Sequence, residues 1–102
     1  MLKRLSLIAT LTLPAPVLAQ ELSKEESCGY QADVVAAVQQ ARKDRVKERD
    51  VAEAIAKTEP EWPESFNNAI PLIAPWVYEQ ERKVIRKEDL SAVWLELCLK
   101  QS

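Results

Sequence analysis

The chain has 102 residues, 14 of them basic and 16 acidic, which is enough for one small domain with a hydrophobic core. It contains no histidine and a single glycine, which excludes the commonest catalytic base and the glycine-rich loops that bind nucleotide phosphates. The small excess of acidic side chains argues against general binding to nucleic acid, because that affinity comes mainly from basic charge.

Residues 1–19 have the three parts of a secretory signal peptide. Two cations precede an apolar run from Leu5 to Leu13, and the small residues before Ala19 match the pattern that signal peptidases cleave. A membrane anchor needs about 20 apolar residues, whereas this segment is shorter and contains two prolines. We therefore expect a mature domain of residues 20–102, without a transmembrane segment, in the bacterial periplasm or outside the cell. Because the two cations leave with the signal peptide, the net charge becomes −4 rather than −2.

The chain has two cysteines, Cys28 and Cys98. In an exported chain of this size the default expectation is one intramolecular disulfide. An intermolecular bridge and a reactive thiol are the alternatives. A cysteine metal site is disfavoured, because the chain has neither a histidine nor a pair of cysteines at zinc-ligand spacing.

The first mature segment is typical of an amphipathic helix, which we expect over residues 24–45. Ser23 and Glu26 have the spacing of a capping box, in which each side chain bonds the other residue's backbone N–H. Val34, Val35 and Val38 recur at helical spacing, and the pattern predicts that the side chain of Gln39 lies away from this apolar face.

A second capping pattern, Asp50 with Glu53, predicts a helix from Val51 to about Thr58. Two prolines end this helix, and Pro63 is well placed to start a short extra helix.

The second half of the chain predicts two further helices. Pro71 suits the first turn of a helix that reaches Lys83, with Leu72, Ile73, Trp76 and Val77 on its inner side. The last helix has the clearest pattern, since apolar side chains stand at i, i+3, i+4, i+7 and i+8. They are Leu90, Val93, Trp94, Leu97 and Cys98.

Residues 46–55 align with residues 85–94, and each segment joins a charged helix end to a helix that starts after an aspartate. Duplication of a helical hairpin explains this likeness, and so does the general similarity of capped amphipathic helices. We expect an all-α fold: a small four-helix domain of two helical hairpins, with a candidate short extra helix, stapled by one disulfide.

Two groups of residues are candidates for binding a partner. Trp62 lies between two prolines and outside any helical stripe, so it is either an exposed anchor or a lid over the core.

Cations gather at two connections between predicted helices. The connection between the first two helices, the first junction, carries five within residues 42–49, and the connection between the last two, the second junction, carries four. If the junctions meet at one end, they form a basic rim for an anionic lipid head group, a cell-wall phosphate or an acidic protein surface. The helix dipole also favours positive side chains at the C-terminal end of a helix, and this effect explains the same cations without a ligand. The candidates at the second junction are Arg82, Lys83, Arg86 and Lys87.

We expect no catalytic residue, cofactor or metal, and hence a non-enzymatic binding protein whose partner is another envelope or secreted protein. In architecture the chain resembles the small one-disulfide helical proteins of bacterial periplasms. That resemblance implies two alternatives, an acid-stress chaperone that opens when carboxylates are protonated near pH ~4, and an immunity or inhibitor protein. A hydrolase with a carboxylate pair is the least favoured alternative.

Overall fold

The computed structural model describes residues 22–101, so the predicted signal peptide and its cleavage after Ala19 lie outside the described residues. This part of the chain has α-helices and 3-10 helices (labelled η) and no strand, which confirms the predicted all-α class and the short extra helix. In chain order the elements are α1 (Lys24–Lys43), η2 (Glu48–Asp50), α2 (Val51–Ala56), η3 (Glu64–Ala69), α3 (Ile70–Tyr78), α4 (Arg82–Lys87) and α5 (Leu90–Lys100).

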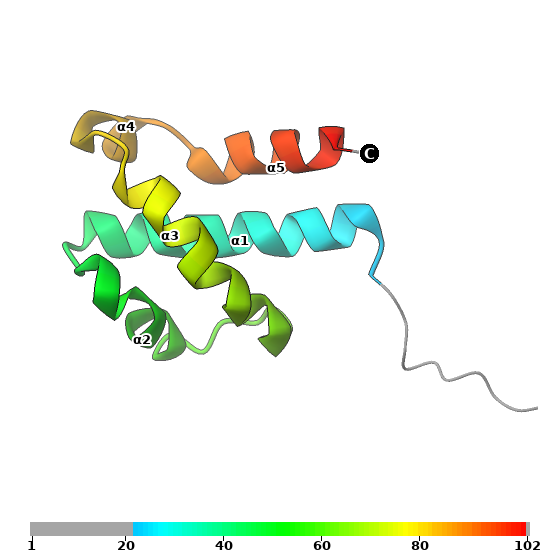
Figure 1. Cartoon of the computed structure of the whole chain (residues 1–102), viewed down its shortest axis with the longest axis horizontal. Helices are drawn as coiled ribbons and strands as arrows, with labels where there is room; N and C mark the ends of the chain where they lie inside the picture. The colour runs from blue at the N-terminus through cyan, green and yellow to red at the C-terminus, as the bar shows by residue number, and fades with distance from the viewer. Residues whose placement is uncertain (1–21, 102) are drawn as a thin grey trace, which may run out of the picture.

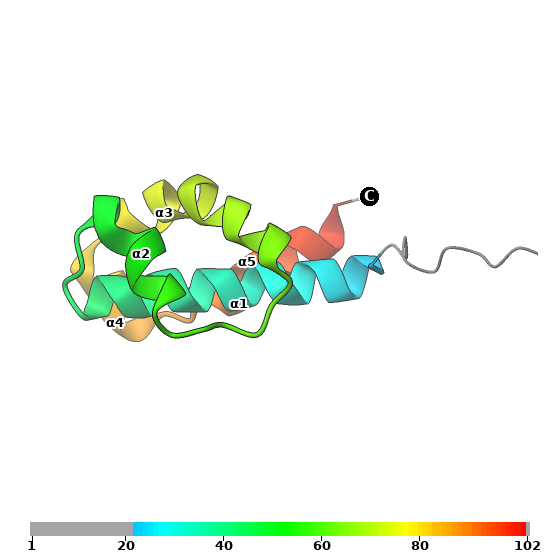
Figure 2. The ribbon, with the colours of Figure 1, turned by 90° about the horizontal axis from the view of Figure 1, so that it is seen from below.

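Helix α1 is the central element of the domain. It starts with the predicted capping box, in which Glu26 N donates to Ser23 Oγ and Ser23 N donates to Glu26 Oε1. Helix α5 lies antiparallel beside α1, α3 crosses α1 at an angle, and α2 lies on the side of α1 away from α5 (Figure 1). The view from below shows the chain from α2 to α3 looping across one side of α1 (Figure 2).

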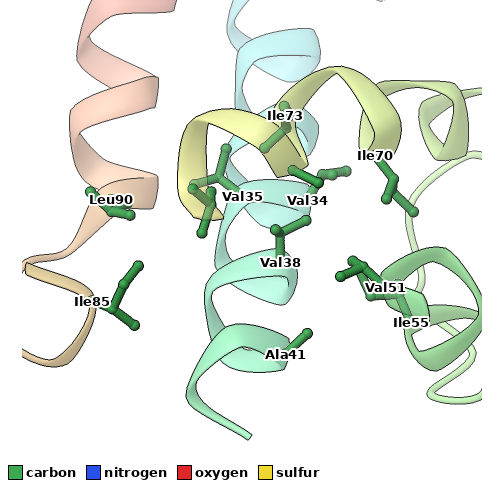
Figure 3. Packing of buried hydrophobic residues seen from close by; sticks show 12 residues of the cluster. Val34, Val35, Val38, Ala41, Val51, Ile55, Ile70, Ile73, Ile85 and Leu90 are labelled. Atoms are coloured by element: carbon green, nitrogen blue, oxygen red, sulfur yellow. The ribbon is translucent and has the colours of Figure 1, made fainter. Parts of the chain in front are cut away.

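The hydrophobic core is built on the valines of α1 (Figure 3). Val34, Val35 and Val38 are completely buried and meet apolar side chains from each of the other α-helices. Burying each such side chain stabilises the fold by about 1.5–3 kcal/mol. The partners are Val51 and Ile55 of α2, Ile70, Ile73, Ala74 and Val77 of α3, Ile85 of α4 and Leu90 of α5.

Several positions differ from the sequence-based expectation. Leu72 is 78 % exposed, because the helix in which it lies meets the core only through its other face. On α5 only Leu90 is fully buried, whereas Trp94 is half-buried and Val93 and Leu97 are exposed. Asp50 makes no side-chain cap, because it belongs to the 3-10 turn η2 that precedes α2.

The helix predicted from Pro71 to Lys83 is two helices. Helix α3 ends at Tyr78, and residues 79–81 separate it from α4. The side-chain amide of Gln80 donates to the Trp76 carbonyl, which satisfies one of the free carbonyls at the end of α3.

The predicted disulfide joins Cys28 in α1 to Cys98 in α5, with the two Cα atoms 5.7 Å apart. It closes a loop of 70 residues and fastens the start of the first helix to the end of the last one.

Replacing both cysteines by alanine should lower the free energy of unfolding by about 4 kcal/mol, because the unfolded chain loses a long closed loop. Urea unfolding of the oxidised protein and of Cys28→Ala/Cys98→Ala measures this difference. Reduction of the wild-type protein should give the same loss, and an unchanged unfolding midpoint in both cases would contradict the prediction.

Candidate functional site

One glutamine side chain of α1 holds the turn between α4 and α5. Gln39 is 6 % exposed, and its Nε2 atom donates to the carbonyls of Ile85 (2.8 Å) and Glu88 (2.9 Å). Its Oε1 atom accepts from the backbone N–H of Leu90 at 3.2 Å. The amide thus satisfies backbone groups at the end of α4 and the start of α5 that have no partner within their own helices. The prediction that Gln39 lies away from the core was wrong.

Arg42 and Tyr78 bring the two helix junctions together. The Arg42 guanidinium lies 5.1 Å from the centre of the Tyr78 ring, and its Nη2 atom donates to the Gln80 carbonyl at 3.2 Å. The Tyr78 hydroxyl donates to the Val46 carbonyl at 2.7 Å. Burial raises the pKa of this phenol, a rise that the Arg42 charge opposes and the Glu48 charge adds to. The C-terminal end of α1 is therefore fixed against the connection between α3 and α4.

A surface hollow of about 440 Å³ lies between α4 and the C-terminal end of α1 with the turn that follows it. Five of its six lining residues are cations, three from the first junction and two from the second, and the sixth is an isoleucine. We call it the basic pocket, and it is lined by Arg42, Lys43, Arg45, Arg82, Ile85 and Arg86.

No cation of the basic pocket forms an ion pair within the described residues, although Asp89 lies near enough to Lys43 for the two charges to attract each other. Among residues 22–101 the structure has one ion pair, Lys100 with Glu96 at 3.5 Å, and it lies on α5 near the disulfide. The buried Nε atom of Arg42 has no hydrogen-bond partner within the described part of the chain. Ile85 is 2 % exposed and provides an apolar wall. Five cations without an ion-pair partner, beside an apolar wall, concentrate positive potential inside the hollow, so this arrangement attracts an anion.

The predicted cations of α4 fall into two pairs. Arg82 and Arg86, four residues apart on one side of the helix, line the basic pocket. Lys83 and Lys87 are exposed and do not line it. Arg42, Lys43 and Arg45 were predicted only as part of a basic rim shared by the two junctions, because the cations of the second junction alone were named as candidates.

Trp62 lies away from the basic pocket. It is half-buried against the core, and its Nε1 atom donates to Asn67 Oδ1 at 2.8 Å. With Tyr30, Asp33, Pro60 and Glu61 it lines a separate hollow of about 390 Å³.

The described residues contain neither a candidate metal site nor a membrane-spanning helix. No three or more histidine, cysteine, aspartate or glutamate side chains within residues 22–101 are grouped so that they could hold a metal ion. No helix in the same range is both long enough and apolar enough to cross a membrane. Comparison with models of protein families, with curated proteins and with solved structures finds no match for this chain.

Replacing Gln39 by alanine should destabilise the domain by about 2 kcal/mol or more, since each buried backbone group left without a partner costs about 1–3 kcal/mol. Urea unfolding gives the free-energy change, and amide hydrogen exchange should show faster exchange of the Leu90 N–H. Gln40→Ala is the matched control, because the neighbouring Gln40 is exposed and bonds only Asp44 on its own helix end. Equal losses in the two variants would contradict the role assigned to Gln39.

Proposed function

We propose that this chain is a small exported binding protein of the bacterial envelope, without catalytic activity, which holds an anionic group of another envelope or secreted component. The observation that carries the proposal is the basic pocket, in which cations from both helix junctions surround one hollow and none of them forms an ion pair within residues 22–101.

The charge of the whole protein strengthens this argument. The chain has a net charge of −2, yet five cations lie around a single hollow. Gathering like charges costs electrostatic free energy, and a bound anion offsets that cost. A local positive field on an acidic protein also guides an anionic partner to one place and repels it from the rest of the surface.

The inventory of reactive side chains supports binding rather than catalysis. The chain has no histidine, and both cysteines are joined in the disulfide. The usual base and the usual activated thiol are therefore absent from the described residues.

The sharpest test compares two double variants of the same short helix. Arg82→Gln/Arg86→Gln removes two charges that line the basic pocket, and Lys83→Gln/Lys87→Gln removes two that do not. The wild-type protein and both variants are immobilised and exposed to extract of the source envelope. A component retained by the wild type and by the lysine variant, but lost from the arginine variant, is the expected result.

Circular dichroism verifies that both variants keep the helical fold. The proposal is wrong if nothing is retained, or if the two variants lose a retained component to the same extent. Equal losses would mean that overall charge, rather than the pocket, drives the association.

A second candidate, the acid-stress chaperone, is favoured by the start of α5. Asp89 Oδ1 accepts from the Ser91 hydroxyl at 2.7 Å and from the Ala92 N–H at 3.1 Å, and these bonds lower the pKa of Asp89. The lowered pKa contributes stability that is present above the ordinary aspartate value of about 3.9 and is lost as the pH falls through the folded-state pKa. Acid therefore loosens the cap of a helix that carries the exposed side chains Val93 and Leu97.

Asp89→Asn separates this acid response from general unfolding, because asparagine also caps helices but does not titrate. Between about pH 7 and about pH 3 the wild-type protein should lose more stability than the variant, since only the aspartate is protonated. Urea unfolding and binding of a dye specific for exposed apolar surface measure the response. Equal stability losses, with no dye binding at the lower pH, would rule out the chaperone.

A further inference from the structure

The basic pocket gathers more charge than a single carboxylate neutralises. Five cations line it, whereas a carboxylate carries one negative charge. A phosphate monoester carries a charge of about −1.5 to −2 near neutral pH, so one bound phosphate group neutralises more of the pocket's positive charge than one carboxylate does. The charge count therefore favours an anion with several charges on neighbouring oxygens.

The chemistry of the cations favours phosphate as well. Four of the five are arginines, whose planar guanidinium groups offer paired N–H donors to two oxygens at once. Arg82 and Arg86 lie one helical turn apart on α4. They line the hollow together with Lys43, at the end of α1, and Arg45, in the turn that follows it. Donors thus approach the hollow from two sides, which suits the tetrahedral arrangement of phosphate oxygens.

The wall of the hollow is partly apolar. The buried side chain of Ile85 forms the apolar part of the wall, and a low-polarity wall strengthens each charge interaction beside it.

We infer that the basic pocket binds a multiply charged phosphate group, of the diphosphate or phosphate-monoester class. This inference rests on the proposed function and deepens it by naming the chemistry of the anionic group. Such a group occurs on soluble phosphates, on phosphate-bearing polymers and on lipid head groups, all of which present the same oxygens to the guanidinium donors.

Calorimetric titration of the oxidised protein with sodium pyrophosphate tests the inference directly. Sodium citrate at equal ionic strength is the comparison, because it presents a similar total charge on carboxylates. We expect one site at which pyrophosphate binds at least about tenfold more tightly than citrate, because the paired N–H donors of each guanidinium group match the spacing of phosphate oxygens. Binding that is absent, or equal for the two anions, overturns the inference.

The arginine and lysine double variants then locate the site. Arg82→Gln/Arg86→Gln should weaken pyrophosphate binding by at least about tenfold, since two charge-assisted donor groups are lost. Lys83→Gln/Lys87→Gln, which has the same net charge, should change the affinity by less than about threefold, because these two side chains do not line the hollow and act on it only through salt-screened solvent. Equal weakening in both variants would overturn the assignment to this pocket.

A vesicle experiment distinguishes the sources of phosphate once pyrophosphate binding is established. Co-sedimentation with phosphatidylcholine vesicles that contain phosphatidic acid, and absence of co-sedimentation with phosphatidylcholine alone, would show that the pocket reaches a lipid phosphate. Pyrophosphate binding without retention on either vesicle would assign the site to soluble or polymer-borne phosphate. Both results support the inference and differ only in the source.

The two proposals can fail separately. If the arginine variant loses an envelope component while pyrophosphate does not bind, the proposed function stands and the phosphate inference is wrong. If pyrophosphate binds in the basic pocket but no envelope component depends on Arg82 and Arg86, the phosphate site stands and the envelope partner is wrong.

Discussion

The side-chain amide of Gln39 occupies, inside the domain, the place that water would take at the ends of two helices. Its three hydrogen bonds reach backbone groups of Ile85, Glu88 and Leu90, which lie 46 to 51 residues further along the chain. Helix α4 has six residues, too few to be stable in isolation, so its position depends on this amide and on the burial of Ile85. The orientation of two arginines, and with it the shape of the basic pocket, therefore depends on a polar group that carries no charge.

The basic pocket also illustrates how a fold can tolerate an unfavourable cluster of charge. Repulsion among its cations opposes the packing of α4 against α1. Contacts elsewhere offset that repulsion: the buried valines, the disulfide at the far end of α1, and the stacking of Arg42 on Tyr78. Most of these cations still satisfy the local rule of helix stability, since Arg42, Lys43 and Arg86 lie in the last turns of their helices. Arg82 departs from it, because it stands in the first turn of α4.

Local signals in the sequence were sufficient for much of the fold. The helical class, the capping box at Ser23 and the pairing of the two cysteines follow from spacing and composition alone. Features that depend on distant backbone could not be predicted in this way. The burial of Gln39 requires knowledge of which carbonyls lie opposite it. The break after Tyr78 is hidden because residues 79–83 are Glu, Gln, Glu, Arg and Lys, all of which favour a continuing helix. The site was predicted in part. The cations of both junctions were evident in the sequence, but which cations of α4 line the basic pocket depends on how that helix is rotated.

The disulfide and the basic pocket lie at opposite ends of the long central helix. Both ends of the described chain lie at the disulfide end, where Lys24 Nζ donates to the Gln101 carbonyl. Helix α1 has 20 residues and spans about 30 Å, since each residue adds about 1.5 Å. The two ends of the domain therefore differ: one holds both ends of the described chain, and the other holds the basic pocket. A tether attached at either described end would hold the domain to a surface with the basic pocket turned away from that surface.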